Sequence, residues 1–195
     1  MHCGHAPVWE NGTLSRQHPD FSERDELGEC PKQYGQCNLG PTSGGAEYAL
    51  NYTLDLLRAH PSTSAFMIDN AFWQDSLHDG LSYPSGFSAS AVTSFRRYVS
   101  ERFGARAAAF LGANASDVAP PVSSERNLTA PSPLFGVWKL WRSRSYASAV
   151  EAFRAPLHRA GVSLLANTAW WPLKWDLAND EVLQHVDGVV SESHA

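Results

Sequence analysis

The stretch AFMIDNAFW, residues 65–73, decides both the fold and the candidate chemistry of this 195-residue chain. Four mostly apolar residues lead directly to Asp69 and Asn70, and the chain then becomes aromatic again. A short apolar run of this kind predicts a buried strand. A buried strand does not normally end on a carboxylate that has no basic residue near it. The stretch therefore indicates a strand whose tip carries a functional acid.

Helical and extended patterns alternate along the chain around this strand. Leu50, Leu54 and Leu57 recur at helical spacing, and the pair His60-Pro61 ends that helix. The same reasoning predicts helices at about 46–59, 88–103, 135–159 (with a kink at Pro156) and 179–186, and strands at 65–69, 162–167 and 187–193. Alternation of this kind predicts parallel strands joined by right-handed crossovers, which is an α/β architecture.

Two features favour a parallel (β/α) barrel of TIM type over a nucleotide-binding sheet. No glycine-rich phosphate loop follows a predicted strand, and polar residues close successive strands, where such barrels keep their chemistry. A full barrel needs about 250 residues, so three predicted strands in this chain indicate one incomplete barrel domain over residues 1–195, about half to two-thirds of the whole. Residues 1–45 are expected to be a loop-rich entry segment, and residues 112–133 a Pro/Ser-rich insertion.

The overall charge and the apolar runs exclude two kinds of partner at the sequence level. The net charge is −5 and no basic block is present, so we expect no nucleic-acid partner, because phosphate binding needs clustered Lys and Arg. The longest apolar runs are far below the roughly 18 residues needed to cross a bilayer. We therefore expect no insertion into a membrane.

Four Asn-x-Ser/Thr patterns favour an extracellular or secretory location for a glycoprotein, although the chain shows no signal peptide. Chance predicts roughly one such match, against the four at Asn11, Asn51, Asn114 and Asn127. The alternative is that the matches are unused, as they are in bacterial chains. Three cysteines, at positions 3, 30 and 37, allow either one disulfide with a free thiol or no disulfide.

Polar side chains close three of the predicted strands: Asp69-Asn70, Asn167-Thr168 and Glu192. In a parallel barrel all three tips open onto the same face. Two facing carboxylates are the minimum requirement for cleaving a glycosidic bond, one acting on the anomeric carbon or on water and the other donating a proton to the leaving oxygen. Asp69 and Glu192 are therefore the candidate catalytic residues, and Asn167 is a candidate to bind a sugar hydroxyl.

Aromatic residues follow the same tips: Phe72 and Trp73 after the first strand, and Trp170, Trp171 and Trp175 after the second. Indole faces pack against the apolar faces of sugar rings. They also shield a carboxyl group from water and so raise its pKa, as an acid catalyst near neutral pH requires.

Plainer interpretations of these residues stay open. An Asp after a strand is often a turn or helix N-cap residue, Glu192 near a chain end is open to simple solvation, and Trp170 and Trp171 are open to an ordinary core role. A metal-dependent hydrolase is a further alternative, with its ligands drawn from Asp69, His78, Asp79 and Glu192.

Two other chemistries find little support. His2, Cys3 and His5 have no second ligand pair at zinc-like spacing, and no Gly-x-Ser-x-Gly elbow is present for serine-based hydrolysis. The leading hypothesis needs no cofactor.

The stretches AFMIDNAFW and FRRYVSERFG resemble retaining (β/α)8 glycoside hydrolases in which a strand ends on Asp-Asn. The later stretch VSLLANTAWW…LANDEVLQHVDGVVSES is similar in layout to the dextranase-like and related families. The resemblance covers about residues 46–195. It implies that Asp69 is the nucleophile and Glu192 the acid/base, with Asn70, Asn167 and Trp170 lining the sugar site.

The chain also resembles putative glycoside hydrolases of β-galactosidase-like layout. Those enzymes place an acid/base Glu, usually preceded by Asn, on the fourth strand, whereas this chain has Asp69-Asn70 there. Both resemblances imply an oligo- or polysaccharide substrate. Trp73 and Trp171, among the aromatic residues that follow the strand ends, are further candidate contacts. The alternative is a non-catalytic, carbohydrate-binding or inactive barrel fragment.

Overall fold

The computed structural model describes residues 17–30, 32–33, 36–69, 75–78, 81–122, 132–167 and 178–190. Its main sheet has three parallel strands in the order β3-β6-β7. Their bounds are Ala65–Ile68 (β3), Ser163–Asn167 (β6) and Gly188–Val190 (β7). The predicted α/β class with parallel strands is therefore confirmed. The three described strands do not by themselves close into a barrel.

The four predicted helices are present, with ends close to those expected. They are α2 (Gly44–Ala59), α3 (Ala89–Phe103), α5 (Pro133–Arg159) and α6 (Ala178–Leu183). A serine hydroxyl accepts a backbone N–H at the start of each of the first three helices, which satisfies a donor that the helix leaves open. The longest helix, α5, continues through Pro156 to Arg159.

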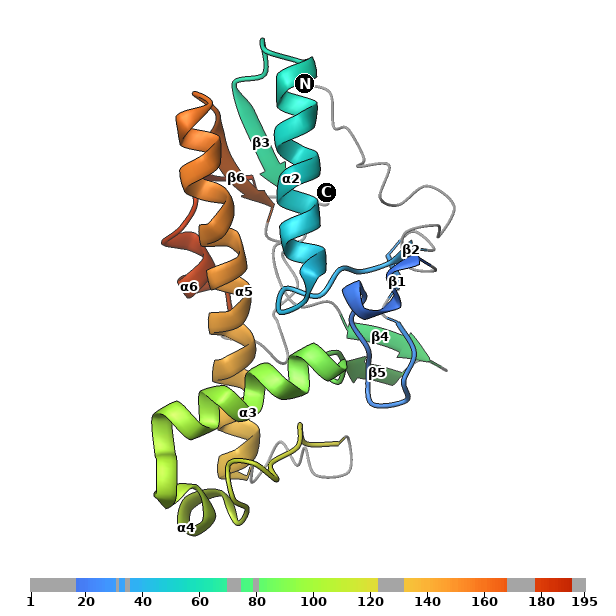
Figure 1. Cartoon of the computed structure of the whole chain (residues 1–195), viewed down its shortest axis with the longest axis vertical. Helices are drawn as coiled ribbons and strands as arrows, with labels where there is room; N and C mark the ends of the chain where they lie inside the picture. The colour runs from blue at the N-terminus through green and yellow to red at the C-terminus, as the bar shows by residue number, and fades with distance from the viewer. Residues whose placement is uncertain are drawn as a thin grey trace, which may run out of the picture.

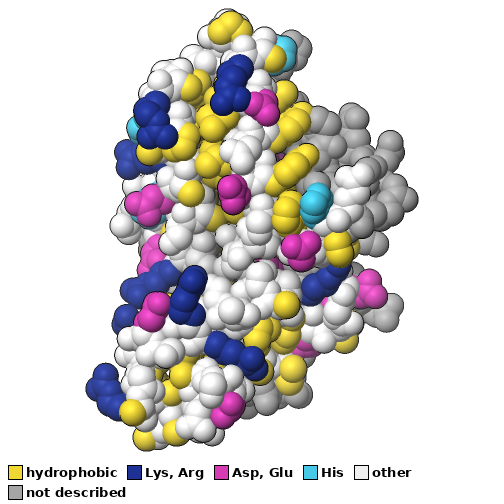
Figure 2. Space-filling model, in the orientation of Figure 1, with side chains coloured by type: hydrophobic (Ala, Val, Ile, Leu, Met, Phe, Trp, Pro, Cys, Tyr) yellow, Lys and Arg dark blue, Asp and Glu magenta, His cyan; other side chains and the backbone are white. Residues whose placement is uncertain are grey.

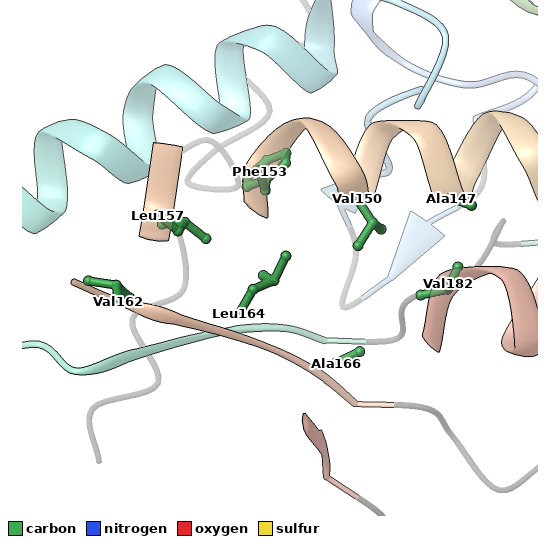
Figure 3. Close-up of a cluster of buried hydrophobic side chains, with 8 residues drawn as sticks. All are labelled: Ala147, Val150, Phe153, Leu157, Val162, Leu164, Ala166 and Val182. Atoms are coloured by element: carbon green, nitrogen blue, oxygen red, sulfur yellow. The ribbon is translucent and has the colours of Figure 1, made fainter. Parts of the chain in front are cut away.

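One face of the sheet is covered by helices. In Figure 1, α2 and α5 run side by side along β3 and β6, and α6 packs beside α5. Figure 3 shows the core between these layers: α5 contributes Ala147, Val150, Phe153 and Leu157, the segment of β6 contributes Val162, Leu164 and Ala166, and α6 contributes Val182. Alternate residues of β6 point into this core, as the two-residue period of a strand requires.

A second core lies where α3 crosses the first half of α5. Ala91, Phe95 and Val99 of α3 are fully buried, and the ring of Phe95 lies 5.3 Å from that of Trp141. The spacing of four between these α3 residues places them on one helical face. The two cores together anchor α5 along most of its length.

Several short elements were not predicted. They are the 3-10 helices η2 (Pro19–Phe21) and η3 (Gly104–Arg106), the helix α4 (Ala107–Leu111), and the antiparallel pairs β1 (Lys32–Gln33) with β2 (Gln36–Cys37) and β4 (Asp75–His78) with β5 (Leu81–Pro84). A disulfide joins Cys30, which precedes β1, to Cys37 of β2. Of the two cysteine alternatives, the structure thus has the one with a disulfide, and Cys3 lies outside the described residues.

No helix in the described part of the chain combines the length and the apolar character that crossing a bilayer requires.

Candidate functional site

The carboxyl end of the sheet brings two of the predicted site residues together. The side-chain amide of Asn167, the last residue of β6, donates a 2.8 Å hydrogen bond to Oδ1 of Asp69, which directly follows β3. Asn167 is buried, with 2 % of its surface exposed, whereas Asp69 is exposed. A buried amide therefore fixes the orientation of a carboxylate that solvent or a ligand can reach.

This contact follows from the strand register. In the parallel pairing, Ile68 lies opposite Ala166, so the next residue along each strand comes to the same edge. Side chains alternate along a strand, and Ala166 points into the helix-covered core. Asn167 therefore points to the opposite face, toward Asp69. The structure thus brings together two of the polar residues that the sequence pattern places at successive strand ends.

Tyr146 of α5 is close enough to Asp69 for its hydroxyl to be affected by that charge, and the sequence did not predict this. It is partly buried and packs against both cores. Burial raises the pKa of its hydroxyl strongly, and the negative charge of Asp69 raises it further. The hydroxyl therefore stays protonated at every physiological pH. The sequence offers one indication of this role. Tyr146 lies on the same helical face as Arg142, Val150 and Phe153, and its side chain ends in a hydroxyl group.

The remaining predicted site residues lie outside the described part of the chain: Asn70, Trp73, Trp170, Trp171 and Glu192. The pairing of Asp69 with Glu192 and the aromatic wall therefore stay predictions. The alternative metal site also stays a prediction, because two of its candidate ligands, Asp79 and Glu192, lie outside the described residues. Within the described residues, no group of three or more His, Cys, Asp or Glu side chains is arranged to hold a metal ion.

A second polar centre lies in the entry segment and was also missed. Glu23 has only 2 % of its surface exposed, and the hydroxyl of Ser88, the N-cap of α3, donates a 3.2 Å hydrogen bond to it. Burial raises the pKa of Glu23 to about 7. The bond from Ser88, the backbone of Arg24 and Gly86, and the charge of Arg142 oppose this rise but do not cancel it.

Glu23 holds the entry segment against two helices. Its backbone N–H bonds to the carbonyl of Asn38 at 3.0 Å, while its side chain reaches α3 at Ser88 and lies near the buried Arg142 of α5. The guanidinium of Arg142 lies 4.9 Å from the ring centre of Trp138. Glu23 is one of several acidic residues in a loop-rich segment, so the sequence gives no signal that predicts its burial.

A separate groove of about 570 Å³ lies on the helical face, between α2, α3 and α5. Figure 2 views this face: Lys and Arg side chains are interspersed with Asp and Glu, and apolar side chains are exposed between them. The lining includes Glu47 of α2, Arg97 of α3 and Arg144 of α5, with many small residues, and contains none of the predicted site residues. The candidate site therefore remains the edge of the sheet.

Comparison with models of protein families finds no match, and neither does comparison with curated protein sequences. Comparison with solved structures finds matches that include two β-galactosidases. The enzyme from Bacillus circulans sp. alkalophilus superposes with a TM-score of 0.67 and 18 % identity, and the enzyme from the psychrophilic Marinomonas ef1 with 0.65 and 18 %. Each match covers 93 % of this chain but 28 % of the β-galactosidase chain.

This likeness shows a fold shared with glycoside hydrolases, over less than a third of the length of the enzymes that it matches. It agrees with a fold of β-galactosidase type and gives no support to the dextranase-like family that the sequence also suggested. The expected incomplete barrel is compatible with it, although closure of a barrel is not shown.

Proposed function

We propose that this chain is a domain of glycoside hydrolase type that acts on an oligo- or polysaccharide at the carboxyl ends of β3 and β6. The observation that carries the proposal is the bond from Asn167 to Asp69 at this edge, on a fold shared with two β-galactosidases. In barrels of this kind the carboxyl ends of the strands hold the active site. An oriented, solvent-accessible carboxylate is the group that such chemistry needs first.

In the proposed reaction, Asp69 attacks the anomeric carbon while Glu192 donates a proton to the departing glycosidic oxygen. The bond from carbon to the leaving group breaks as the bond to Asp69 forms, and water, deprotonated by Glu192, then releases the sugar. Retention of configuration requires a separation of about 5–5.5 Å between the two carboxyl groups, and about 6.5–9.5 Å would mean inversion.

The other groups of the site would bind and orient the sugar. Asn167 holds Asp69 in place, and Tyr146, which stays protonated, supplies a neutral group close to that charge. Asn70, Trp73, Trp170 and Trp171 are proposed to line the pocket. We also propose that further strands close the sheet into a barrel, since parallel sheets are normally covered on both faces.

A second candidate is a domain that binds carbohydrate without cleaving it. The β-galactosidase-like layout, as described above, has an acid/base Glu directly after an Asn, whereas Asn70 is followed here by Ala71. If that position is the counterpart, the proton donor of the related layout is missing. The pocket would then retain its polar and aromatic lining but lack the chemistry.

The two candidates are separated by measuring hydrolysis and binding on the same variants. We expect Asp69→Asn to abolish hydrolysis of activated aryl glycosides while the glycan that the wild type binds is still bound. The matched control is Asp20→Asn, an exposed aspartate in η2. Full hydrolysis by Asp69→Asn would remove Asp69 from the mechanism, and glycan binding without any hydrolysis by the wild type would favour the second candidate.

We also propose an extracellular or secretory location. The Cys30–Cys37 disulfide supports it, because structural disulfides persist mainly in oxidising compartments.

A further inference from the structure

Two of the four Asn-x-Ser/Thr patterns lie in the described part of the chain, and the structure distinguishes them. Asn51 and Thr53 belong to the middle of α2, whereas Asn114 and Ser116 belong to the turn that follows α4. An N-linked glycan is bulky and must remain in solvent. In the folded chain, a pattern can accept a glycan only where its asparagine and its hydroxyl are both accessible.

The Asn51 pattern does not meet this requirement in the folded chain. The side chain of Asn51 is exposed, but Thr53 is buried, with 4 % of its surface exposed. The hydroxyl of Thr53 donates a 2.8 Å hydrogen bond to the carbonyl of Ala49 inside the helix. The hydroxyl of this pattern is therefore part of the packing of α2.

The Asn114 pattern does meet it. Both Asn114 and Ser116 are exposed, and their side chains donate hydrogen bonds of 3.1 and 2.9 Å to the exposed carboxylate of Asp117. The asparagine that carries a glycan keeps one N–H, so its bond to Asp117 can persist after modification. The local structure does not have to change to accept the sugar.

The turn is held at both ends. Gly112 ends α4 in the left-handed conformation, with φ at 78°. On the other side Val118 is buried, and the side chain of Arg96 donates a 2.9 Å hydrogen bond to its carbonyl. Residues between these two anchors are thus presented to solvent by a fixed frame.

The position of the turn keeps a glycan away from the candidate site. In Figure 1, α4 lies at one end of the molecule, beyond α3, while β3 and β6 occupy the other half. A glycan at this turn would lie on a surface that the sheet edge does not share. It would therefore leave Asp69 and Asn167 open to a substrate.

We propose that Asn114 is an N-glycosylation site of this protein. The side-chain nitrogen of Asn114 forms a bond to the anomeric carbon of an oligosaccharide, and the bond from that carbon to the pyrophosphate of a lipid-linked donor breaks. The amide loses one proton, and the lipid pyrophosphate leaves. The Cys30–Cys37 disulfide independently points to the oxidising compartment in which this transfer takes place.

The test is to express the full chain behind a cleavable secretory leader in a eukaryotic host and to map its glycans. Treatment with peptide-N-glycosidase in heavy-oxygen water marks each released asparagine by mass. Both the secreted and the retained protein are mapped, because the glycan is attached before export. The variants are Asn114→Gln, Ser116→Ala, Ser116→Thr and, as the matched control, Asn51→Gln.

We expect a mark at Asn114 in the wild type and in Ser116→Thr, and its loss in Asn114→Gln and Ser116→Ala. Asn51→Gln is expected to leave the pattern of marks unchanged. An unmarked Asn114 in protein whose Cys30–Cys37 disulfide has formed would overturn the proposal. So would a mark at Asn51 in place of Asn114.

Discussion

The side chains of Asp69 and Asn167 are joined by a 2.8 Å hydrogen bond although 98 residues separate them along the chain. Two parallel strands in register bring them to one edge of the sheet. The bond links a buried amide to an exposed carboxylate, so changing the amide tests the role of the carboxylate without altering it.

Replacing Asn167 with leucine keeps a similar volume but removes the donor to Asp69. We expect the rate of hydrolysis, or the affinity for glycan, to fall at least tenfold, because the carboxylate is no longer held in one orientation. The measurement is kcat/KM on aryl glycosides, or the glycan dissociation constant if no hydrolysis occurs. The control is Ser163→Ala, an exposed position at the opposite end of β6. Unchanged activity and affinity in Asn167→Leu would show that the bond has no part in function.

The buried Glu23 makes the stability of the fold depend on pH near neutrality. Its pKa in the fold is about 7, against an ordinary value of 4.5, so the fold favours the protonated acid. The contribution of protonated Glu23 to the free energy of unfolding is fully present below pH 4.5 and is lost as the pH rises through about 7. The shift corresponds to about 3 kcal/mol of unfolding free energy between pH 4.5 and pH 8, as an upper estimate.

Glu23→Gln keeps the shape of the side chain and removes its titration. We expect chemical denaturation to show a wild type that is less stable at pH 8 than at pH 5, and a variant in which this particular loss is absent. Glu29→Gln, at an exposed position in the same segment, serves as the control and should follow the wild type. Parallel pH profiles for wild type and Glu23→Gln would contradict the buried, protonated state.

The strongly periodic parts of the fold were predictable from the sequence, and the reason is local. Phe95 and Val99 repeat at helical spacing, and the mostly apolar runs at 65–68 and 162–166 are long enough to mark strands. Their order also gave the parallel sheet, because a strand that returns through a helix pairs in parallel.

The parts that could not be predicted depend on contacts between distant residues. The pairs β1–β2 and β4–β5 have short strands without clear alternation, so no period marks them. The burial of Glu23 depends on Ser88 and on Arg142 of α5, both of which are far away in the sequence. In the site, Asp69 and Asn167 were found because strand tips are visible in sequence, whereas Tyr146 looked like one more residue of a helical core.

Asp187 is expected to stabilise the end of the sheet that lies opposite the candidate site. Its carboxylate accepts bonds from the ring of His158 at 2.7 Å and from the backbone N–H of Leu164 at 2.8 Å. These bonds lower the pKa of Asp187, and the bond from His158 has the largest effect. The contribution of ionised Asp187 to the free energy of unfolding is therefore present above the ordinary value of 3.8 and is lost as the pH falls through the lowered value. We expect Asp187→Asn to lose about 1–2 kcal/mol of unfolding free energy at pH 7. We expect the variant to keep its activity while its stability falls, because Asp187 lies at the end of the sheet opposite Asp69 and Asn167.

Urea denaturation at pH 7 and pH 4 measures this effect. Asp55→Asn is the control, since Asp55 pairs with Arg58 on the exposed surface of α2 and such pairs contribute little. A loss in Asp55→Asn as large as that in Asp187→Asn would contradict a specific role of the His158 and Leu164 contacts.

The Cys30–Cys37 disulfide is expected to stabilise the entry segment through the short loop that it closes. The two cysteines are seven residues apart, and a loop of this length corresponds to about 2 kcal/mol of unfolding free energy in the chain-entropy account. We expect the double variant Cys30→Ser/Cys37→Ser to lose about this amount in chemical denaturation. The wild type measured in reducing agent should match it. Cys3→Ser is the control, because the disulfide leaves Cys3 out, and its stability should equal that of the wild type in both conditions. A loss in Cys3→Ser, or a reduced wild type as stable as the oxidised protein, would mean that this pairing does not stabilise the fold.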